Sequence, residues 1–159
     1  MPRPTSARGR LLPAVAALAA ALAIGGCSAL RATPPAPTPA DFPGLAGVLA
    51  QRGVLVTDYV SGDPGCDDPT LAPTAIRFEA TGFELAEGTT IRIYIFRNRE
   101  AYERRRGDVD ICALAWAGDP AAIEAIDVSP YVLVGSGPWP PEFKRALRDG
   151  LIEAGGTGG

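Results

Sequence analysis

From residue 42 onward, the order of apolar and polar positions predicts a mixture of helices and strands. Leu45, Val48 and Leu49 share the spacing of one helix face, and Gly53 is expected to end that short helix. Alternating or continuous apolar positions predict strands, and segments rich in Gly, Pro and Asp predict the connections between them. The predicted strands lie at 54–60, 75–81 and 89–97, with connections at 61–73 and 82–88.

The second half of the domain gives a similar mixture. A short helix over 99–106 is expected to end at Gly107, and the carboxylate of Asp119 followed by Pro120 predicts the start of a helix that runs to residue 126. Residues 109–117 fit both periods, and we favour a strand because Ile111, Ala113 and Ala115 alternate. An interior strand at 131–134 and an amphipathic helix at 140–154 complete the prediction.

Such a mixture without a strict strand–helix–strand rhythm predicts an α+β fold. We expect a small, mostly antiparallel sheet with the helices packed on one face. Residues 42–155 form a segment of about the length that a single hydrophobic core can stabilise, so one domain is predicted there. A flexible tail is predicted at 156–159.

The first 26 residues have the pattern of an export signal. Three arginines and no acid lie in residues 1–10, an apolar run relieved only by Pro13 covers residues 11–24, and Gly25 and Gly26 follow it. The apolar run is shorter than the ~20 residues that a membrane-spanning helix needs. We therefore predict a cleaved signal peptide at 1–26, with an uncleaved anchor as the weaker alternative.

Cys27 directly follows this signal. The sequence Ile24-Gly25-Gly26-Cys27 resembles the lipobox of bacterial lipoproteins, in which an aliphatic residue and two small residues precede an invariant cysteine. The resemblance covers residues 1–27 only. It implies that the sulfur of Cys27 receives a diacylglyceryl group, that cleavage makes Cys27 the first residue, and that fatty chains hold the protein at a membrane. Secretion without a lipid remains the alternative.

Residues 27–41 are predicted to be a spacer behind the lipidated cysteine. Pro34, Pro35, Pro37 and Pro39 stand among alanine and threonine, a composition typical of an extended linker. The expected location is the cell membrane or the outer membrane, with the domain on the extracytoplasmic side. In lipoproteins of this kind an Asp after the cysteine marks retention at the inner membrane; Ser28 stands there, which leaves the choice between the two membranes open.

The number of cysteines agrees with this interpretation. The chain has three, an odd number that needs an explanation in an exported protein. If Cys27 carries lipid, Cys66 and Cys112 remain as a pair in an oxidising compartment, and we expect them to form a disulfide worth about 4 kcal/mol in the chain-entropy model.

Charge and composition narrow the classes of function. The part after residue 26 holds twelve basic and 18 acidic residues, a net charge of −6, which disfavours nucleic acid as a partner. The chain has no histidine, so histidine-dependent catalytic triads are excluded. We expect no cofactor and no metal.

Two groups of acids are candidate sites. Asp63, Asp67 and Asp68 could offer oxygen ligands to calcium, but a polar turn beside a disulfide is the favoured interpretation. Asp108 and Asp110 would point to the same side of an extended segment and could act as an acid and base pair, although turn or strand-entry acids are favoured.

Five arginines lie within ten residues of this otherwise acidic domain and form a candidate anion-binding site. A solvated helix face, with Glu100 and Glu103 as ion-pair partners, is the favoured interpretation, and docking on anionic lipid is the alternative. The arginines are Arg97, Arg99, Arg104, Arg105 and Arg106.

The turn at 135–138 is rich in glycine, but it lacks the spacing of a hydrolase nucleophile elbow because Val134 stands two residues before Ser136. Trp139 is expected to pack over Phe143 rather than to form an exposed contact.

These patterns contain no complete catalytic constellation. We therefore favour a non-catalytic envelope lipoprotein whose small domain binds a protein, a polymer or a small ligand. The alternatives are an envelope hydrolase that uses carboxylates such as Asp67, Asp68, Asp108 or Asp110, and an inhibitor or accessory subunit of an envelope complex.

Overall fold

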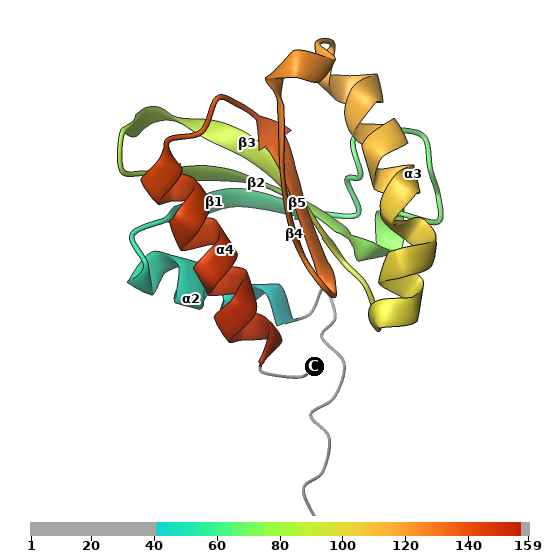
Figure 1. The fold of residues 1–159 in the computed structure, drawn as a ribbon, viewed down its shortest axis with the longest axis horizontal. Coiled ribbons are helices and arrows are strands. Elements are labelled where there is room, and N and C mark those ends of the chain that lie inside the picture. The colour runs from blue at the N-terminus through green and yellow to red at the C-terminus, as the bar shows by residue number, and fades with distance from the viewer. Residues whose placement is uncertain (1–40, 157–159) are drawn as a thin grey trace, which may run out of the picture. The chain divides into compact units, whose positions relative to one another are not determined.

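The computed structural model describes residues 41–156. The predicted signal peptide, Cys27, the predicted spacer up to residue 40 and the predicted tail from residue 157 lie outside the described residues. Figure 1 shows how the helices and strands of residues 41–156 are arranged. They are α2 (Phe42–Gln51), β1 (Leu55–Ser61), η2 (Ala72–Thr74), β2 (Ala75–Gly82), β3 (Leu85–Ile95), α3 (Arg99–Ala117), η3 (Pro120–Ala122), β4 (Ile123–Val128), β5 (Tyr131–Ser136) and α4 (Pro141–Gly155).

The five strands form one antiparallel sheet in the order β1-β2-β3-β5-β4. Its centre is β3, where Ile91 pairs with Phe78 of β2 and Ile93 pairs with Leu133 of β5. Strand β3 begins at Leu85, inside the segment that the sequence predicted as a loose connection. The α+β class and the antiparallel sheet are therefore confirmed.

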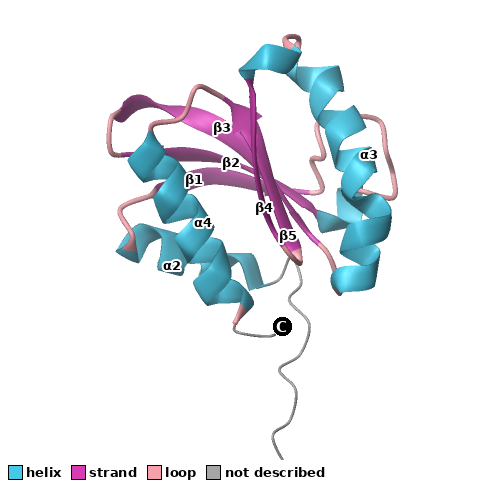
Figure 2. Ribbon diagram, viewed as in Figure 1, coloured by secondary structure: helices cyan, strands magenta, loops and turns pink. Residues whose placement is uncertain are grey.

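The helices lie on both faces of this sheet, with α2 and α4 on one side and α3 on the other (Figure 2). The first face buries alternate residues such as Ile93 and Leu133 under Leu49 and Leu147. On the second face, Tyr94 and Val132 pack against α3. The prediction of helices on one face thus holds for α2 and α4, whereas α3 packs on the opposite face because β3 and β5 are apolar on both sides.

The prediction of a strand at 109–117 was wrong, since α3 continues from Arg99 through Gly107 to Ala117. Its buried residues Val109, Cys112 and Ala113 have helical spacing and face the sheet. The alternation of Ile111, Ala113 and Ala115 gave no strand, because Ile111 is exposed and only Ala113 is buried. Gly107 does not end the helix.

The predicted helix at 119–126 was also wrong. Asp119 caps as expected, accepting a hydrogen bond from the Ala121 amide at 2.9 Å, but only the single turn η3 follows. The chain then enters β4, where Ile126 is buried and pairs with Leu133 of β5. Pairing with an interior strand and burial of Ile126 outweighed the local start signal.

Helix α4 agrees with the amphipathic pattern that predicted it. Phe143, Leu147 and Leu151 are fully buried against the first face of the sheet. Trp139 is only 3% exposed and meets the Phe143 ring edge-on at 5.9 Å, so the predicted packing of these two rings is confirmed.

Candidate functional site

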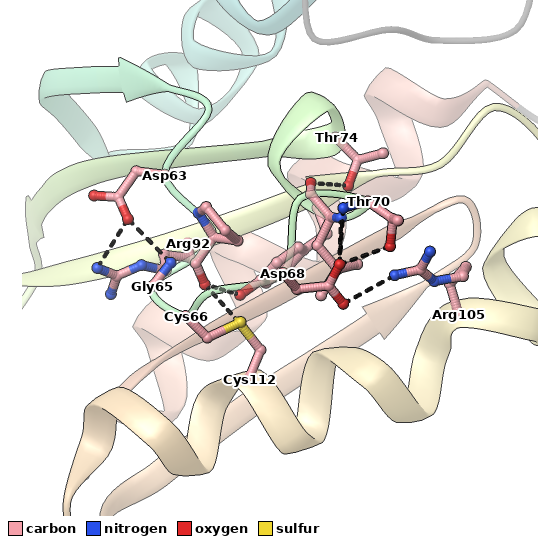
Figure 3. Close-up of a disulfide and its surroundings, with 12 residues drawn as sticks. Asp63, Gly65, Cys66, Asp68, Thr70, Thr74, Arg92, Arg105 and Cys112 are labelled. Atoms are coloured by element: carbon pink, nitrogen blue, oxygen red, sulfur yellow. Dashed lines mark hydrogen bonds and ion pairs between the residues drawn. A yellow bond between two sulfur atoms is a disulfide. The ribbon is translucent and has the colours of Figure 1, made fainter.

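The loop between β1 and β2 is fixed to α3 by a disulfide (Figure 3). Cys66 of the loop and Cys112 of α3 are bonded, with their Cα atoms 5.3 Å apart. The hydroxyl of Tyr94 on β3 donates a hydrogen bond to the carbonyl of Pro64 at 2.7 Å, and burial raises the pKa of Tyr94 to about 12. The pairing of Cys66 with Cys112 expected from the cysteine count is present, and it makes this loop part of the folded body.

Asp63 links the start of this loop to the sheet. Its carboxylate accepts hydrogen bonds from the Gly65 amide at 3.0 Å and from the Arg77 guanidinium at 3.0 Å, and Arg92 lies 3.4 Å away. The Arg92 guanidinium also stacks 4.7 Å from the centre of the Trp116 ring, a cation–π contact. Gly65 has a positive φ of 81°, and a Cβ there would meet Trp116 at 2.4 Å. These ion pairs, hydrogen bonds and the cation–π contact hold the start of the loop against the sheet and α3.

Asp68 stabilises the turn that follows the disulfide. Its Oδ1 accepts hydrogen bonds from the Thr70 hydroxyl at 2.6 Å and from the Thr70 amide at 2.8 Å, and its other oxygen pairs with Arg105 at 3.1 Å (Figure 3). The hydrogen bonds from Thr70 are the main reason that the pKa of Asp68 is lowered. Asp68 is therefore an ionised turn residue, as the favoured interpretation of this loop proposed.

Three of the four carboxylates considered for catalysis line one open hollow of about 310 Å³ beside the disulfide. They are Asp67, Asp68 and Asp108, and the rest of the wall includes Pro69, Ile111 and Ala115. Arg105 pairs with both Asp68 and Asp108 and so neutralises part of their charge. Asp110 is not among the lining residues and pairs with Arg106 instead.

Asp108 and Asp110 are not a pair, because both lie on a helix rather than on a strand. Residues two apart on a helix point in different directions, and each of these carboxylates binds a different arginine. Within residues 41–156, no three His, Cys, Asp or Glu side chains lie close enough together to hold a metal ion.

Four of the five clustered arginines are in ion pairs. Arg99 pairs with Glu103 at 2.8 Å and Arg104 with Glu100 at 3.0 Å, the partners that the sequence indicated. Arg105 and Arg106 lie partly buried between α3 and the rest of the domain, while Arg97 is exposed.

Arg106 bridges Asp110 of α3 and Asp127 of β4. Burial opposes its charge, but the hydrogen bonds that it donates to the two carboxylates raise its pKa above the ordinary value. Carboxylates of the domain therefore neutralise four of the five arginines. This leaves a weak site for an anionic partner.

The outer side of α3 carries exposed aliphatic side chains that the sequence analysis did not single out. Ile111 is 69% exposed and Leu114 is 51% exposed, with the exposed Ala115 beside them. Neither tryptophan forms such a patch, since Trp139 is buried and Trp116 lies partly buried against Arg92. Residues 107, 111, 114 and 118 have the spacing of one helix face, which would have indicated this surface if the segment had been predicted as a helix.

The fold and this site define an α+β domain with a disulfide-held loop and an exposed apolar helix face. The chain matches no protein-family model, and no curated protein or solved structure is significantly similar to it. None of the helices in residues 41–156 is long and apolar enough to span a membrane.

Proposed function

We propose that the chain is a bacterial envelope lipoprotein, anchored to the membrane through lipid on Cys27, whose domain at 42–155 is a non-catalytic binding module. The anchor rests on the export pattern of residues 1–26 and on the cysteine that follows it. The even pair of cysteines that remains in the domain, Cys66 and Cys112, supports export to an oxidising compartment.

The observation that carries the binding role is the outer face of α3, which we define as Gly107, Ile111, Leu114, Ala115 and Gly118. Large aliphatic side chains that are more than half exposed and adjacent on one helix lose contact with water when a partner covers them. This face adjoins the hollow beside the disulfide, because Ile111 and Ala115 also line that hollow. A partner would therefore contact a continuous, mainly apolar surface.

The carboxylates of the hollow favour binding over hydrolysis. Acid and base catalysis by two carboxylates needs two groups with different proton affinities, placed to reach one substrate. Asp68 has a lowered pKa and is engaged by Thr70 and Arg105, and Asp108 is held by the same arginine. Asp67 is then the one carboxylate of the hollow that has no ion-pair partner among the described residues.

The anchor is tested by the intact mass of the chain isolated from the membrane of its native host. The expected mass is that of a chain beginning at Cys27 with a diacylglyceryl group and a further acyl chain or none. A chain that begins at Cys27 without lipid, or that retains residues 1–26, contradicts the anchor.

The binding role is tested by affinity isolation from detergent-solubilised native envelopes. Leu114→Arg is compared with Ile152→Arg, because Ile152 is an equally exposed aliphatic residue, 49% exposed, on α4. A protein that is recovered with the unmodified chain and with Ile152→Arg, but at least tenfold less with Leu114→Arg, is the expected result. Equal recovery with both variants, or no recovered partner, contradicts the proposal.

A further inference from the structure

We propose that the outer face of α3 joins two copies of this chain, with the two α3 helices antiparallel about a two-fold axis. This deepens the binding role proposed above and rests on it, since it names the partner as a second copy.

The face lies on the side of α3 that points away from the sheet. Gly107, Ile111, Leu114 and Gly118 of this face follow one another at alternating steps of four and three residues, the spacing by which two helices pack along a common line, and Arg104 lies on the same line three residues before Gly107. The buried residues of α3, Val109, Cys112 and Ala113, occupy the opposite side. The line is thus free to meet a second helix.

The face is complementary to itself in the antiparallel direction. Ile111 and Leu114 are equally far from the midpoint between Cys112 and Ala113, and so are Gly107 and Gly118. When two copies of α3 run in opposite directions around that midpoint, Ile111 of each packs on Leu114 of the other. Gly107 of each then lies opposite Gly118 of the other. A two-fold pair needs this reciprocity, because the same patch serves both copies.

The two glycines allow the helices to come close at both ends of the contact. A Cβ added at Gly107 or at Gly118 would meet no atom of the domain within 4 Å, so the fold itself does not require a small residue at Gly107. Gly118 has a positive φ of 68° and ends the helix. The distance between packed helices depends on the size of the side chains at the contact, and glycine gives the shortest.

The charges around the face favour the antiparallel direction. In a parallel pair Arg104 would lie beside Arg104 of the other copy, and Glu103 would lie near Asp108. In the antiparallel pair the exposed Arg104 comes to the end of the partner helix where the exposed Asp119 lies. Asp108 and Asp110 then lie near alanines of the partner helix, Ala115 and Ala117 respectively. Arg104, which pairs with Glu100 of its own helix, thus gains a second acid from the other copy, and the two Arg104 side chains are kept apart.

The same acids argue against an anionic membrane as the occupant. Glu100, Glu103, Asp108 and Asp110 flank the face, and they would be repelled by acidic lipid head groups. Arg99 and Arg104 are already paired with two of these acids. A protein surface with apolar residues and a matching acid and base fits the face better.

The contact is short, since the overlap from Gly107 to Gly118 is about 18 Å of helix. An interface of that length falls at the weak end for protein pairs. Two domains anchored by lipid in one membrane meet at a raised effective concentration, which strengthens a weak contact without a new interaction. The pair is therefore expected on the membrane, and the test is made there.

The experiment uses two full-length copies with different C-terminal tags, expressed together in the native host. They are cross-linked in the intact envelope with a short photo-reactive reagent that does not need lysine side chains, because Lys144 is the only lysine of the chain. Gly107→Arg in both copies is compared with Gly47→Arg, because Gly47 is an exposed glycine of α2 at which an added Cβ also meets no atom within 4 Å. Isolation through the first tag should recover the second tag from the unmodified chain and from Gly47→Arg. Gly107→Arg should recover at least tenfold less.

Loss of folding does not explain that result if the thermal unfolding midpoint of Gly107→Arg is no lower than that of the unmodified chain, as expected when arginine replaces glycine on an open helix surface. Equal recovery of the second tag with Gly107→Arg, or no recovery from the unmodified chain, overturns the proposal. If the affinity isolation described above then recovers a different protein, and Leu114→Arg but not Ile152→Arg reduces its recovery, the binding role stands and only the second copy is excluded as the partner. If Leu114→Arg reduces the recovery of no protein, the binding role and the pairing of two copies both fail.

Discussion

Helices α4 and α3 cover opposite faces of the same sheet in different ways. Helix α4 places Phe143, Leu147 and Leu151 inward, all fully buried, so apolar packing holds it. Helix α3 places Val109 and the small residues Cys112 and Ala113 inward and leaves Ile111 and Leu114 outward. It is held by this apolar packing, by the disulfide and by ion pairs such as that of Arg106 with Asp127. Both faces of the sheet are therefore buried, but α4 covers its face with large side chains, whereas α3 adds a covalent bond to smaller ones and leaves two neighbouring aliphatic residues exposed.

The largest difference in stability is expected when one side chain is truncated on each of the two helices, Phe143 on α4 and Ile111 on α3. Phe143→Ala should lower the free energy of unfolding by about 3–5 kcal/mol, because it leaves a cavity in a fully packed core. Ile111→Ala should change it by less than about 0.5 kcal/mol, since Ile111 is already exposed. Denaturant unfolding of both variants measures this, and similar losses would show that α3 is packed like α4.

Removal of the disulfide tests what holds α3 to the loop. The double variant Cys66→Ser, Cys112→Ser should lower the free energy of unfolding by about 2–4 kcal/mol, because the bond closes a loop with a sequence separation of 46. The reduced, unmodified chain should lose a similar amount. Unfolding curves that coincide with and without the bond would contradict the role given to it.

Alanine at two helical glycines should act in opposite directions. Gly150→Ala on α4 should destabilise by about 1–3 kcal/mol, since the new Cβ would lie 2.6 Å from Cδ2 of Leu49. Gly107→Ala on α3 should stabilise by about 0.5–1 kcal/mol, because its Cβ meets no atom and alanine favours the helix. Thermal unfolding of both variants measures the signs, and a loss at Gly107 would mean that this side of α3 is not open.

The smallest effect concerns Tyr94, whose hydroxyl joins β3 to the loop. Tyr94→Phe should lower the free energy of unfolding by about 1 kcal/mol at neutral pH, because the hydrogen bond to the Pro64 carbonyl is lost.

This variant should also change the response to alkaline pH. The pKa of Tyr94 rises from 10.0 to about 12 on folding, so its neutral form contributes stability that is complete below pH 10 and is lost as pH rises through 12. Tyr94→Phe should therefore lose stability less steeply between these values. Some slope should remain, because burial also raises the pKa of Tyr102 and Tyr131. An unchanged slope would contradict the burial of a neutral hydroxyl at Tyr94.

The sequence predicted those parts of the fold in which local pattern and tertiary packing agree. Phe143 and Leu147 have helical spacing and Ile91 and Ile93 alternate, and each set is buried as its pattern indicates. The pattern failed at 109–117 because the small residues Cys112 and Ala113 face the sheet while the larger Ile111 and Leu114 point outward. It failed at 123–128 because pairing with β5 outweighed a local helix start at Asp119.

The candidate site was predicted in its parts but not in its arrangement. The pairing of Cys66 with Cys112 followed from counting cysteines, and the partners of Arg99 and Arg104 followed from helical spacing. That Arg105 joins Asp68 to Asp108 depends on how the loop folds over α3, which one-dimensional spacing does not contain. The exposed apolar face was missed for the same reason as the helix itself.

Site-specific photo-cross-linking in living cells shows whether a partner covers the outer face of α3. A photo-reactive amino acid replaces Leu114 in one strain and Ile152 in another, two aliphatic positions of nearly equal exposure, 51% and 49%. A discrete protein adduct at position 114, and none at position 152, is the predicted result. Adducts of equal yield at both positions, or none at position 114, would mean that no partner covers this face.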